Sequence, residues 1–444
     1  MTSGPPRVLV VGGGYVGLGA SLRLLRRAHR GEVRLTVVDP RGYMTYHPFL
    51  PEAAAGSIDA RNVVVGLRRT LPGAEVLTGE VVAVHHAERV ARVRSADAPE
   101  QEQELGYDHL VLAPGSVART LPVPGLAEQA VGFKTVEEAV HLRDRVLRSL
   151  ELAEASGDGA FRRRTLTCVF VGGGYAGVEA LAEVEDMARY ALRFHPGLRP
   201  QEVRFVLVEA SGRILPEVGP RLGAHALDVL RSRGVDVRLG TTMTSCVDGH
   251  VVLSDGSRFE AGTIVWTAGV KAHPLLERTD LPLDAHRRLV VGADLRVVRE
   301  GPDGPRVLEG AWGAGDSAAV PDLTAPGRTC PPNAQHAVRQ ARRLADNLLA
   351  VLRGRQPRPY RHAGAGSVAS LGLHQGVAEV GGLRLTGYPA WLVHRTYHLS
   401  KVPTPSRKAG VLLGWLQAAV FHREAVSLGA LSHPFEQFER AARG

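Results

Sequence analysis

The sequence has few cysteines, few aromatic residues and no long apolar run, and each absence excludes a class of protein. The cysteines Cys168, Cys246 and Cys330 lie far apart and form no C-x-x-C pair. This spacing excludes a disulfide framework and a local redox disulfide, and it fits a reducing cytoplasm. No stretch reaches the roughly 18 consecutive apolar residues of a spanning helix, so none is expected to cross a bilayer.

The charge balance is basic, yet it does not take the form that nucleic-acid binding requires. The 54 Lys and Arg residues exceed the 45 Asp and Glu residues, which gives a net charge of +9. Such an excess favours nucleic acid or an anionic membrane surface as a partner. However, there is no long Lys/Arg block and no zinc-ligand spacing, and only 5% of residues are aromatic. We therefore expect no nucleic-acid partner and no metal site.

One glycine-rich motif occurs twice in the chain, which at 444 residues is long enough for two or three domains. "VGGGYVG" occupies 11–17 and "VGGGYAG" occupies 171–177, each between a short apolar run and a helical pattern. The G-x-G-x-x-G positions are Gly12, Gly14 and Gly17 in the first copy, and Gly172, Gly174 and Gly177 in the second. In dinucleotide-binding turns these glycines allow the tight turn, the approach of a pyrophosphate and close helix packing. The chain thus predicts two dinucleotide sites.

An acidic residue closes the strand that follows each glycine turn. Asp39 ends the run 34–39, and Glu209 ends the corresponding run after the second turn. A carboxylate at this place can accept hydrogen bonds from ribose hydroxyls. Glu209 favours NADH over NADPH because a carboxylate repels a 2′-phosphate, although the nearby Arg213 leaves NADPH open.

Two nucleotide sites in one chain predict electron transfer between a held flavin and a transient nicotinamide. In "GAWGAGDS", Asp316 follows Gly315 after an apolar run, where it can bind the ribityl chain of a flavin. "HLVLAPGS" and "GTIVWTAGV" are matching strands whose turns carry Ala113 and Gly269, two further candidate cofactor contacts. The pattern predicts an α/β fold with two Rossmann-like domains, and a further helix from about residue 333 to 352.

These motifs together resemble a known group of flavoproteins. The chain is similar to the pyridine nucleotide–disulfide oxidoreductase superfamily, and within it to type II NADH dehydrogenases, single-subunit NADH:quinone oxidoreductases that pump no protons. Besides the two glycine turns, the resemblance rests on "YHPFLPEAAAG", "LAPGS", "WTAGV", "AGD", "PPNAQHAVRQA" and "GSVASLG…GLRLTGYPAW". The cysteine pair that the disulfide reductases of this superfamily need is missing.

The resemblance implies cofactors and domain bounds. FAD is expected on the first turn with Asp39 and Asp316, in a domain formed by 1–118 and 271–360. NADH is expected on the second turn with Glu209, in a domain spanning 119–270. The remaining residues, 361–444, would form a helical or mixed region for membrane association or dimerisation.

The resemblance also implies catalytic candidates. Glu179 matches an acid near the nicotinamide and the quinone, although a carboxylate in the first turn of a helix is also favoured by the helix dipole. Gln335 and Gln340 match glutamines of the quinone motif A-Q-x-A-x-Q-Q-G, or they lie on an ordinary polar helix face. Arg339 and Ala341 depart from that motif. A soluble oxidoreductase with another acceptor, or a redox-sensing protein, therefore stays open.

The C-terminal region is basic and carries apolar stripes. Residues 380–423 contain Arg and Lys but no Asp or Glu. The stripes comprise Trp391, Leu392, Leu412, Trp415, Leu416, Ala419 and Val420. Helices of this kind can lie in a membrane interface, with basic residues at anionic headgroups. We expect peripheral binding at the inner face of the cytoplasmic membrane; the alternative is packing on the protein itself or on a second copy in a homodimer.

Overall fold

The computed structural model describes residues 4–98, 100–302, 304–362, 364, 366–427 and 435–443. By its internal contacts the chain divides into two compact units. Unit 1 comprises 1–45, 65–117 and 270–364; unit 2 comprises 46–64, 118–269 and 365–444. Residues 363, 365, 428–434 and 444 of the expected C-terminal region lie outside the described residues.

Unit 1 is built on an eight-stranded sheet in the order β20-β21-β8-β1-β2-β5-β6-β7. The strands are β1 (Arg7–Val11), β2 (Arg34–Asp39), β5 (Glu75–His85), β6 (Val90–Ser95), β7 (Glu102–Gly106), β8 (His109–Leu112), β20 (Arg296–Arg299) and β21 (Arg306–Gly313). The five strands from β21 to β5 pair in parallel, and the outer strands pair antiparallel. The apolar run of β1 is buried beyond its first residue, as expected for a central parallel strand.

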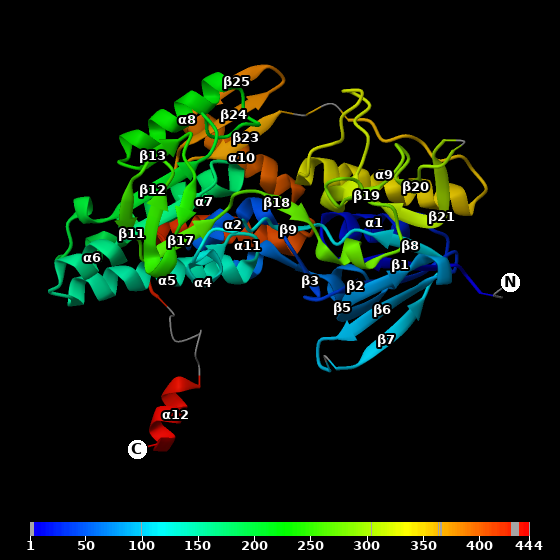
Figure 1. Cartoon of the computed structure of the whole chain (residues 1–444), viewed down its shortest axis with the longest axis horizontal. Coiled ribbons are helices and arrows are strands. Elements are labelled where there is room, and N and C mark those ends of the chain that lie inside the picture. Colours follow the sequence, from blue (N-terminus) through cyan, green and yellow to red (C-terminus); the bar gives the residue numbers. More distant parts are fainter. Residues whose placement is uncertain are drawn as a thin grey trace. The chain divides into compact units, whose positions relative to one another are not determined.

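Two helices, α1 (Tyr15–Arg27) and α9 (Ala334–Leu352), pack against each other in unit 1, as Figure 1 shows. On α1, Ala20 and Leu24 are fully buried. Arg23 of α1 pairs with Asp346 of α9 through two 2.7 Å hydrogen bonds. The expected helix over 333–352 is confirmed, with the Asn333 side chain accepting a hydrogen bond from the His336 amide at its start.

Unit 2 contains a five-stranded parallel sheet in the order β10-β17-β11-β12-β13. The strands are β10 (Ala130–Gly132), β11 (Thr167–Val171), β12 (Arg204–Glu209), β13 (Asp236–Leu239) and β17 (Thr263–Trp266). Helix α7 (Tyr175–Ala191) follows β11 directly and is buried along most of its length. Its neighbours include α2 (Leu50–Ala54) and α5 (Val136–Ala155).

The C-terminal part of unit 2 adds a small antiparallel sheet and two helices. The sheet consists of β23 (Ser367–Ser370), β24 (Gly376–Val380) and β25 (Leu383–Thr386). The helices are α10 (Gly387–Lys401), which packs on this sheet, and α11 (Pro405–Phe421). This region is therefore mixed α/β and belongs by its contacts to unit 2.

The predicted fold class is confirmed: each unit carries a set of parallel strands, and a glycine-rich turn joins one central strand, β1 or β11, to the helix after it. Residues 46–64, which the sequence places inside the first expected domain, belong by contact to unit 2. The reason is local, since α2 packs on α5 and α7. The assignment of each domain to a cofactor stays a prediction at this point.

Candidate functional site

The first glycine turn has the geometry of an anion cradle. Gly12 has φ +95°, and a side chain there would overlap the carbonyl oxygen of Ala113. At Gly17 a Cβ atom would overlap the carbonyl oxygen of Gly12, so helix α1 can approach the turn only with glycine at that place. At Gly14, by contrast, a Cβ atom would meet nothing within 4 Å. The second glycine thus borders open space at the N-terminus of α1, where a pyrophosphate can approach free backbone amides.

The second glycine turn repeats this arrangement in unit 2. Gly172 has φ +114°, and a Cβ atom there would lie 2.8 Å from Thr267. One at Gly177 would overlap the carbonyl oxygen of Gly172, whereas one at Gly174 would meet nothing within 4 Å. Both turns therefore meet the same three steric requirements, with the middle glycine open in each.

The two acids take equivalent positions beside the turns. The carboxylate of Asp39 accepts hydrogen bonds from the amides of Gly13 at 2.7 Å and Arg41 at 2.9 Å. The carboxylate of Glu209 accepts them from the amides of Gly173 at 2.5 Å and Ser211 at 2.7 Å. Each carboxylate is thus held at the end of its strand next to the cradle, within reach of the ribose of a bound dinucleotide.

The turn that carries Asp316 is supported by a buried glutamine. Gly315, with φ +72°, donates its amide to Gln340 Oε1 at 2.7 Å, and Gln340 is 1% exposed. The Ser116 hydroxyl donates to Asp316 Oδ2 at 2.7 Å. Gln340 thus supports the turn that carries Asp316 from its buried side. Gln335 is half-buried in the first turn of α9, and its carbonyl oxygen accepts a hydrogen bond from Arg339 at 2.9 Å.

The two remaining cofactor candidates differ in their surroundings. Ala113 is buried, and its amide donates to the carbonyl oxygen of Val11 at 3.0 Å, which fixes its own carbonyl against the first turn. Gly269 has φ +88°, and a Cβ atom there would meet nothing within 4 Å. Open space thus borders this glycine of unit 2 as it borders Gly174.

Glu179 lies in the first turns of α7, but it is not a solvated helix-dipole carboxylate. It is 7% exposed and accepts a hydrogen bond from the Ser370 amide at 2.9 Å. His394 Nε2 lies 3.1 Å from Glu179 Oε1, although not in line for a hydrogen bond. Burial raises the pKa of Glu179 to about 7 and lowers the pKa of His394 to about 4. A neutral imidazole therefore stands beside a carboxyl that can exchange a proton near neutral pH.

A second buried acid in unit 2, Glu52, was not singled out from the sequence. Its carboxylate accepts hydrogen bonds from Trp415 Nε1 at 2.5 Å and from Arg395 at 3.2 Å. The Arg395 guanidinium lies over the rings of Trp391 and Trp415, 4.1 and 4.8 Å from their centroids. Burial raises the pKa of Glu52 to about 7. The sequence signal was the acid within "YHPFLPEAAAG", whose partners lie far along the chain.

The C-terminal stripes are only partly exposed. Trp391 is buried, and Trp415 is turned toward Glu52 rather than outward. The large apolar residues of α11 that are exposed are Leu412, Leu413, Leu416, Val420 and Phe421, at 50–77% exposure. Among the described helices, none is both long enough and apolar enough to cross a membrane.

The three cysteines are buried and unpaired. Burial raises the pKa of Cys168 to about 12 and that of Cys330 to about 11, so both are protonated, unreactive thiols at neutral pH. In the described part of the chain no group of three or more His, Cys, Asp or Glu residues could hold a metal ion.

Comparison with protein-family models shows to which family this chain with its two glycine turns belongs. Residues 6–341 match the model described as pyridine nucleotide-disulphide oxidoreductase. The chain belongs to this family. The resemblance inferred from the motifs is thereby confirmed.

Relatives of similar length place the chain more narrowly among type II NADH:quinone oxidoreductases. The enzyme of that name from Staphylococcus aureus is 30% identical over 393 residues, covering 86% of this chain and 92% of the relative. Type II NADH:quinone oxidoreductase NdhA of Mycobacterium tuberculosis is also 30% identical, covering 93% and 87%. In fold, the chain is similar to NDH2 from Plasmodium falciparum in complex with NADH, with a TM-score of 0.86 at 16% identity and coverage of 95% and 99%.

Proposed function

We propose that this protein is a type II NADH dehydrogenase that passes two electrons from NADH through FAD to a quinone. In the balanced reaction NADH, one proton and the quinone give NAD⁺ and the quinol. The observation that carries the proposal is the pair of equivalent cradles, one in each unit, each with an open middle glycine and a clamped acid. The family of relatives named for this activity supports it.

The residues present fit these two dinucleotides. A side chain at Gly14 or Gly174 would fill the space that a pyrophosphate needs, and both positions are open. We assign FAD to the first turn with Asp39, Ala113 and Asp316, and NADH to the second turn with Glu209 and Gly269. Bound FAD would supply a two-electron carrier between nicotinamide and quinone. The protein residues bind and orient both molecules and hold a proton at Glu179.

The choice of NADH follows from Glu209. Its two carboxylate oxygens accept backbone hydrogen bonds from Gly173 and Ser211, which keep the charge next to the second turn. A 2′-phosphate would meet this negative charge, whereas a 2′-hydroxyl can donate to it. We therefore propose NADH as the reductant.

In unit 2 we assign Glu179 as the group that holds a proton for the quinone reaction. In unit 1 we assign Gln335 as a contact of the quinone, and Gln340 as a support of the Gly315 turn, because its own side chain is fully buried. The relatives named NADH:quinone oxidoreductases support a quinone as acceptor.

We further propose that α11 attaches the protein to the inner face of the cytoplasmic membrane. Its exposed leucines and Phe421 form an apolar surface, and Arg407 and Lys408 precede that surface on the same helix. An interfacial helix combines such an apolar face with basic residues at the headgroups. A homodimer that covers the same face is the alternative use of this surface.

Substitution of each open glycine in turn tests which glycine turn binds FAD and which binds NADH. Gly174→Val should abolish NADH oxidation while the purified protein retains its yellow flavin, because the added methyl groups fill only the second cradle. Gly14→Val is the matched control and should lose the flavin. Loss of flavin from the Gly174 variant instead would show that the two sites are assigned in reverse.

The departures at Arg339 and Ala341 favour one second candidate, a soluble flavoprotein with a different acceptor. Reoxidation of the NADH-reduced protein distinguishes the two. A quinone should reoxidise the flavin faster than oxygen does; equal rates would favour the second candidate.

A further inference from the structure

Glu179 has a buried neighbour on the same helix that the proposed reaction does not use. Glu183 lies one helical turn further along α7 and is fully buried. Ser370 contacts both acids: its amide donates to Glu179 at 2.9 Å, and its hydroxyl donates to Glu183 at 3.2 Å. The two carboxylates therefore occupy one polar site between α7 and β23.

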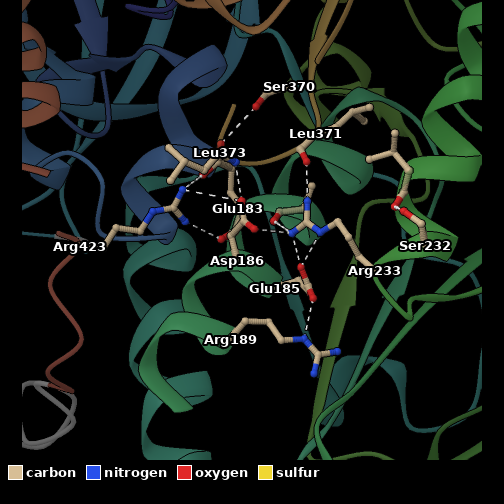
Figure 2. Close-up of polar contacts among 12 residues, drawn as sticks. Glu183, Glu185, Asp186, Arg189, Ser232, Arg233, Ser370, Leu371, Leu373 and Arg423 are labelled. Atoms are coloured by element: carbon tan, nitrogen blue, oxygen red, sulfur yellow. Dashed lines mark hydrogen bonds and ion pairs between the residues drawn. The ribbon is translucent and has the colours of Figure 1, made fainter. Parts of the chain in front are cut away.

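The two acids differ in their counter-charge. Arg423, which follows the end of α11, is buried and donates to Glu183 Oε2 at 2.9 Å and to the carbonyl oxygen of Glu183 at 3.1 Å. The same guanidinium lies 3.9 Å from Asp186. Figure 2 shows Arg423 on one side of this helix and Arg233, which binds Glu185 and Asp186, on the other. The direct partners of Glu179 are Ser370 and His394, and among the residues that the structure describes no arginine pairs with it.

We propose that Glu183 and Arg423 are positioning residues: their fixed ion pair makes Glu179 the carboxyl that exchanges protons with the quinone reaction. This inference rests on the proposed function. Two nearby carboxylates whose surroundings differ in counter-charge divide the roles between them, one staying charged and the other taking the proton. Because Arg423 comes from the chain beyond α11, the C-terminal segment completes this arrangement.

The other groups around Glu179 leave this division in place. From α10, His394 and His398 are held neutral, because burial lowers the pKa of each. From α7 itself, Tyr175 is protonated, because burial raises its pKa. From α2, Glu52 is a further buried carboxyl that interacts electrostatically with Glu183 and Arg423; it is bound to Arg395 of α10, and its pKa is raised by burial to about 7. The fully buried residues of α5, β11 and β12, which also pack on α7, carry no charge.

The charges of Glu183 and Arg423 predict how substitutions in this pair change the protonation of Glu179. Glu183→Gln removes a negative neighbour of Glu179 and leaves the positive charge of Arg423 without its partner. Ionisation of Glu179 therefore becomes easier, and its titration midpoint, the pH at which half of the carboxyl is protonated, should fall by roughly 1 pH unit or more. The double variant Glu183→Gln/Arg423→Gln has a neutral pair again, so the midpoint should return toward that of the unchanged protein. Arg423→Lys keeps the charge and should leave the midpoint in place.

The experiment measures the protonation of Glu179 in two independent ways on the full-length flavoprotein. Infrared difference spectra against pH give the protonated carboxyl band that is lost in Glu179→Gln, without any turnover. Stopped-flow measurement of how fast a water-soluble quinone reoxidises the NADH-reduced protein, repeated over a range of pH, gives the pH dependence of the second half-reaction. Glu185→Gln is the matched control, because Glu185 is equally buried on α7 but bound to Arg233 and Arg189.

A lowered midpoint in Glu183→Gln that rises again in the double variant supports the proposal. An unchanged midpoint, or the same shift in the Glu185 control, overturns it and leaves the ion pair a structural contact. If Glu183→Gln fails to fold, Arg423→Gln provides the test. At pH 8 the carboxyls of Glu179 and Glu183 should then be protonated to a greater extent than in the unchanged protein, and an unchanged infrared spectrum refutes the proposal. If no variant reduces quinone, the proposed function fails, while the infrared result still judges the ion pair.

Discussion

Replacement of Glu179 by glutamine should stabilise the protein and at the same time slow the reaction of its flavin with quinone. In the folded chain burial raises the pKa of this carboxyl from its ordinary 4.5 to about 7. A raised pKa means that the ionised form is disfavoured in the fold. The stability that goes with the protonated form is complete below about pH 4.5 and is lost as pH rises through about 7.

The size of the effect follows from that difference. At about 1.4 kcal/mol per pKa unit, the gap between the two values costs about 3.5 kcal/mol of folding free energy above pH 7. Glutamine carries no charge and can still accept the hydrogen bond from the Ser370 amide, so it avoids this cost. Its extra N–H groups need partners beside His394, which offsets roughly half of the gain.

The assay is thermal unfolding at pH 8 and at pH 5. A net gain of about 1.5 kcal/mol should raise the midpoint by roughly 3–6 °C at pH 8 for a unit of this size. At pH 5 the buried carboxyl is protonated and little is gained by removing it, so the cost of the extra N–H groups should leave the variant no more stable than the unchanged protein. In the same variant, reduction of the flavin by NADH should continue while reoxidation by quinone slows. The reasoning would be refuted if the change in unfolding midpoint relative to the unchanged protein were no larger at pH 8 than at pH 5. Equal loss of both half-reactions would refute it as well.

Three further changes test other parts of the structure. Replacement of Leu413 and Leu416 by serine should abolish sedimentation with anionic liposomes, whereas replacement of the buried Val411 by alanine should not; equal sedimentation of both would argue against α11 as the attachment surface. Glu209→Ala removes the carboxylate beside Gly173 and should raise the use of NADPH relative to NADH, as measured by the ratio of kcat/KM values; an unchanged ratio would place the ribose elsewhere. Gln340→Leu leaves the Gly315 amide without its acceptor and should weaken FAD retention during dialysis by roughly tenfold, since an unmet buried donor costs about 1–3 kcal/mol; full retention would mean that the turn does not depend on Gln340.

The sequence alone predicts what depends on neighbouring residues. The glycine turns, the strands before them and the helices after them are local patterns, and the structure places them as expected. Asp39 and Glu209 are also predictable, because each closes the strand that follows its turn.

Pairings between distant residues were not predictable in this way. Gln335 and Gln340 were expected in a quinone motif or on an ordinary polar helix face, and neither expectation indicates that Gln340 is buried and accepts a hydrogen bond from the Gly315 amide. The tryptophans of the C-terminal stripes were expected at a membrane interface or packed on the protein itself. Trp415 packs on the protein, because its indole donates to the buried carboxylate of Glu52, 363 residues away, a partner that the sequence does not indicate. Nothing near Glu183 or near Arg423 in the sequence indicates that they meet, since their pairing depends on the path of the whole chain.

The division of the chain has a consequence for its biosynthesis. The boundaries at 45/46, 64/65, 117/118, 269/270 and 364/365 make the chain pass repeatedly between the two units. The sheet of unit 1 is complete only when β21 has been made, and the buried Glu183 of unit 2 gains its partner only when Arg423 has been made. Neither unit is a contiguous piece that can finish folding before the other has begun. We therefore expect the nascent chain to depend on protection from aggregation at least until Arg423 has emerged.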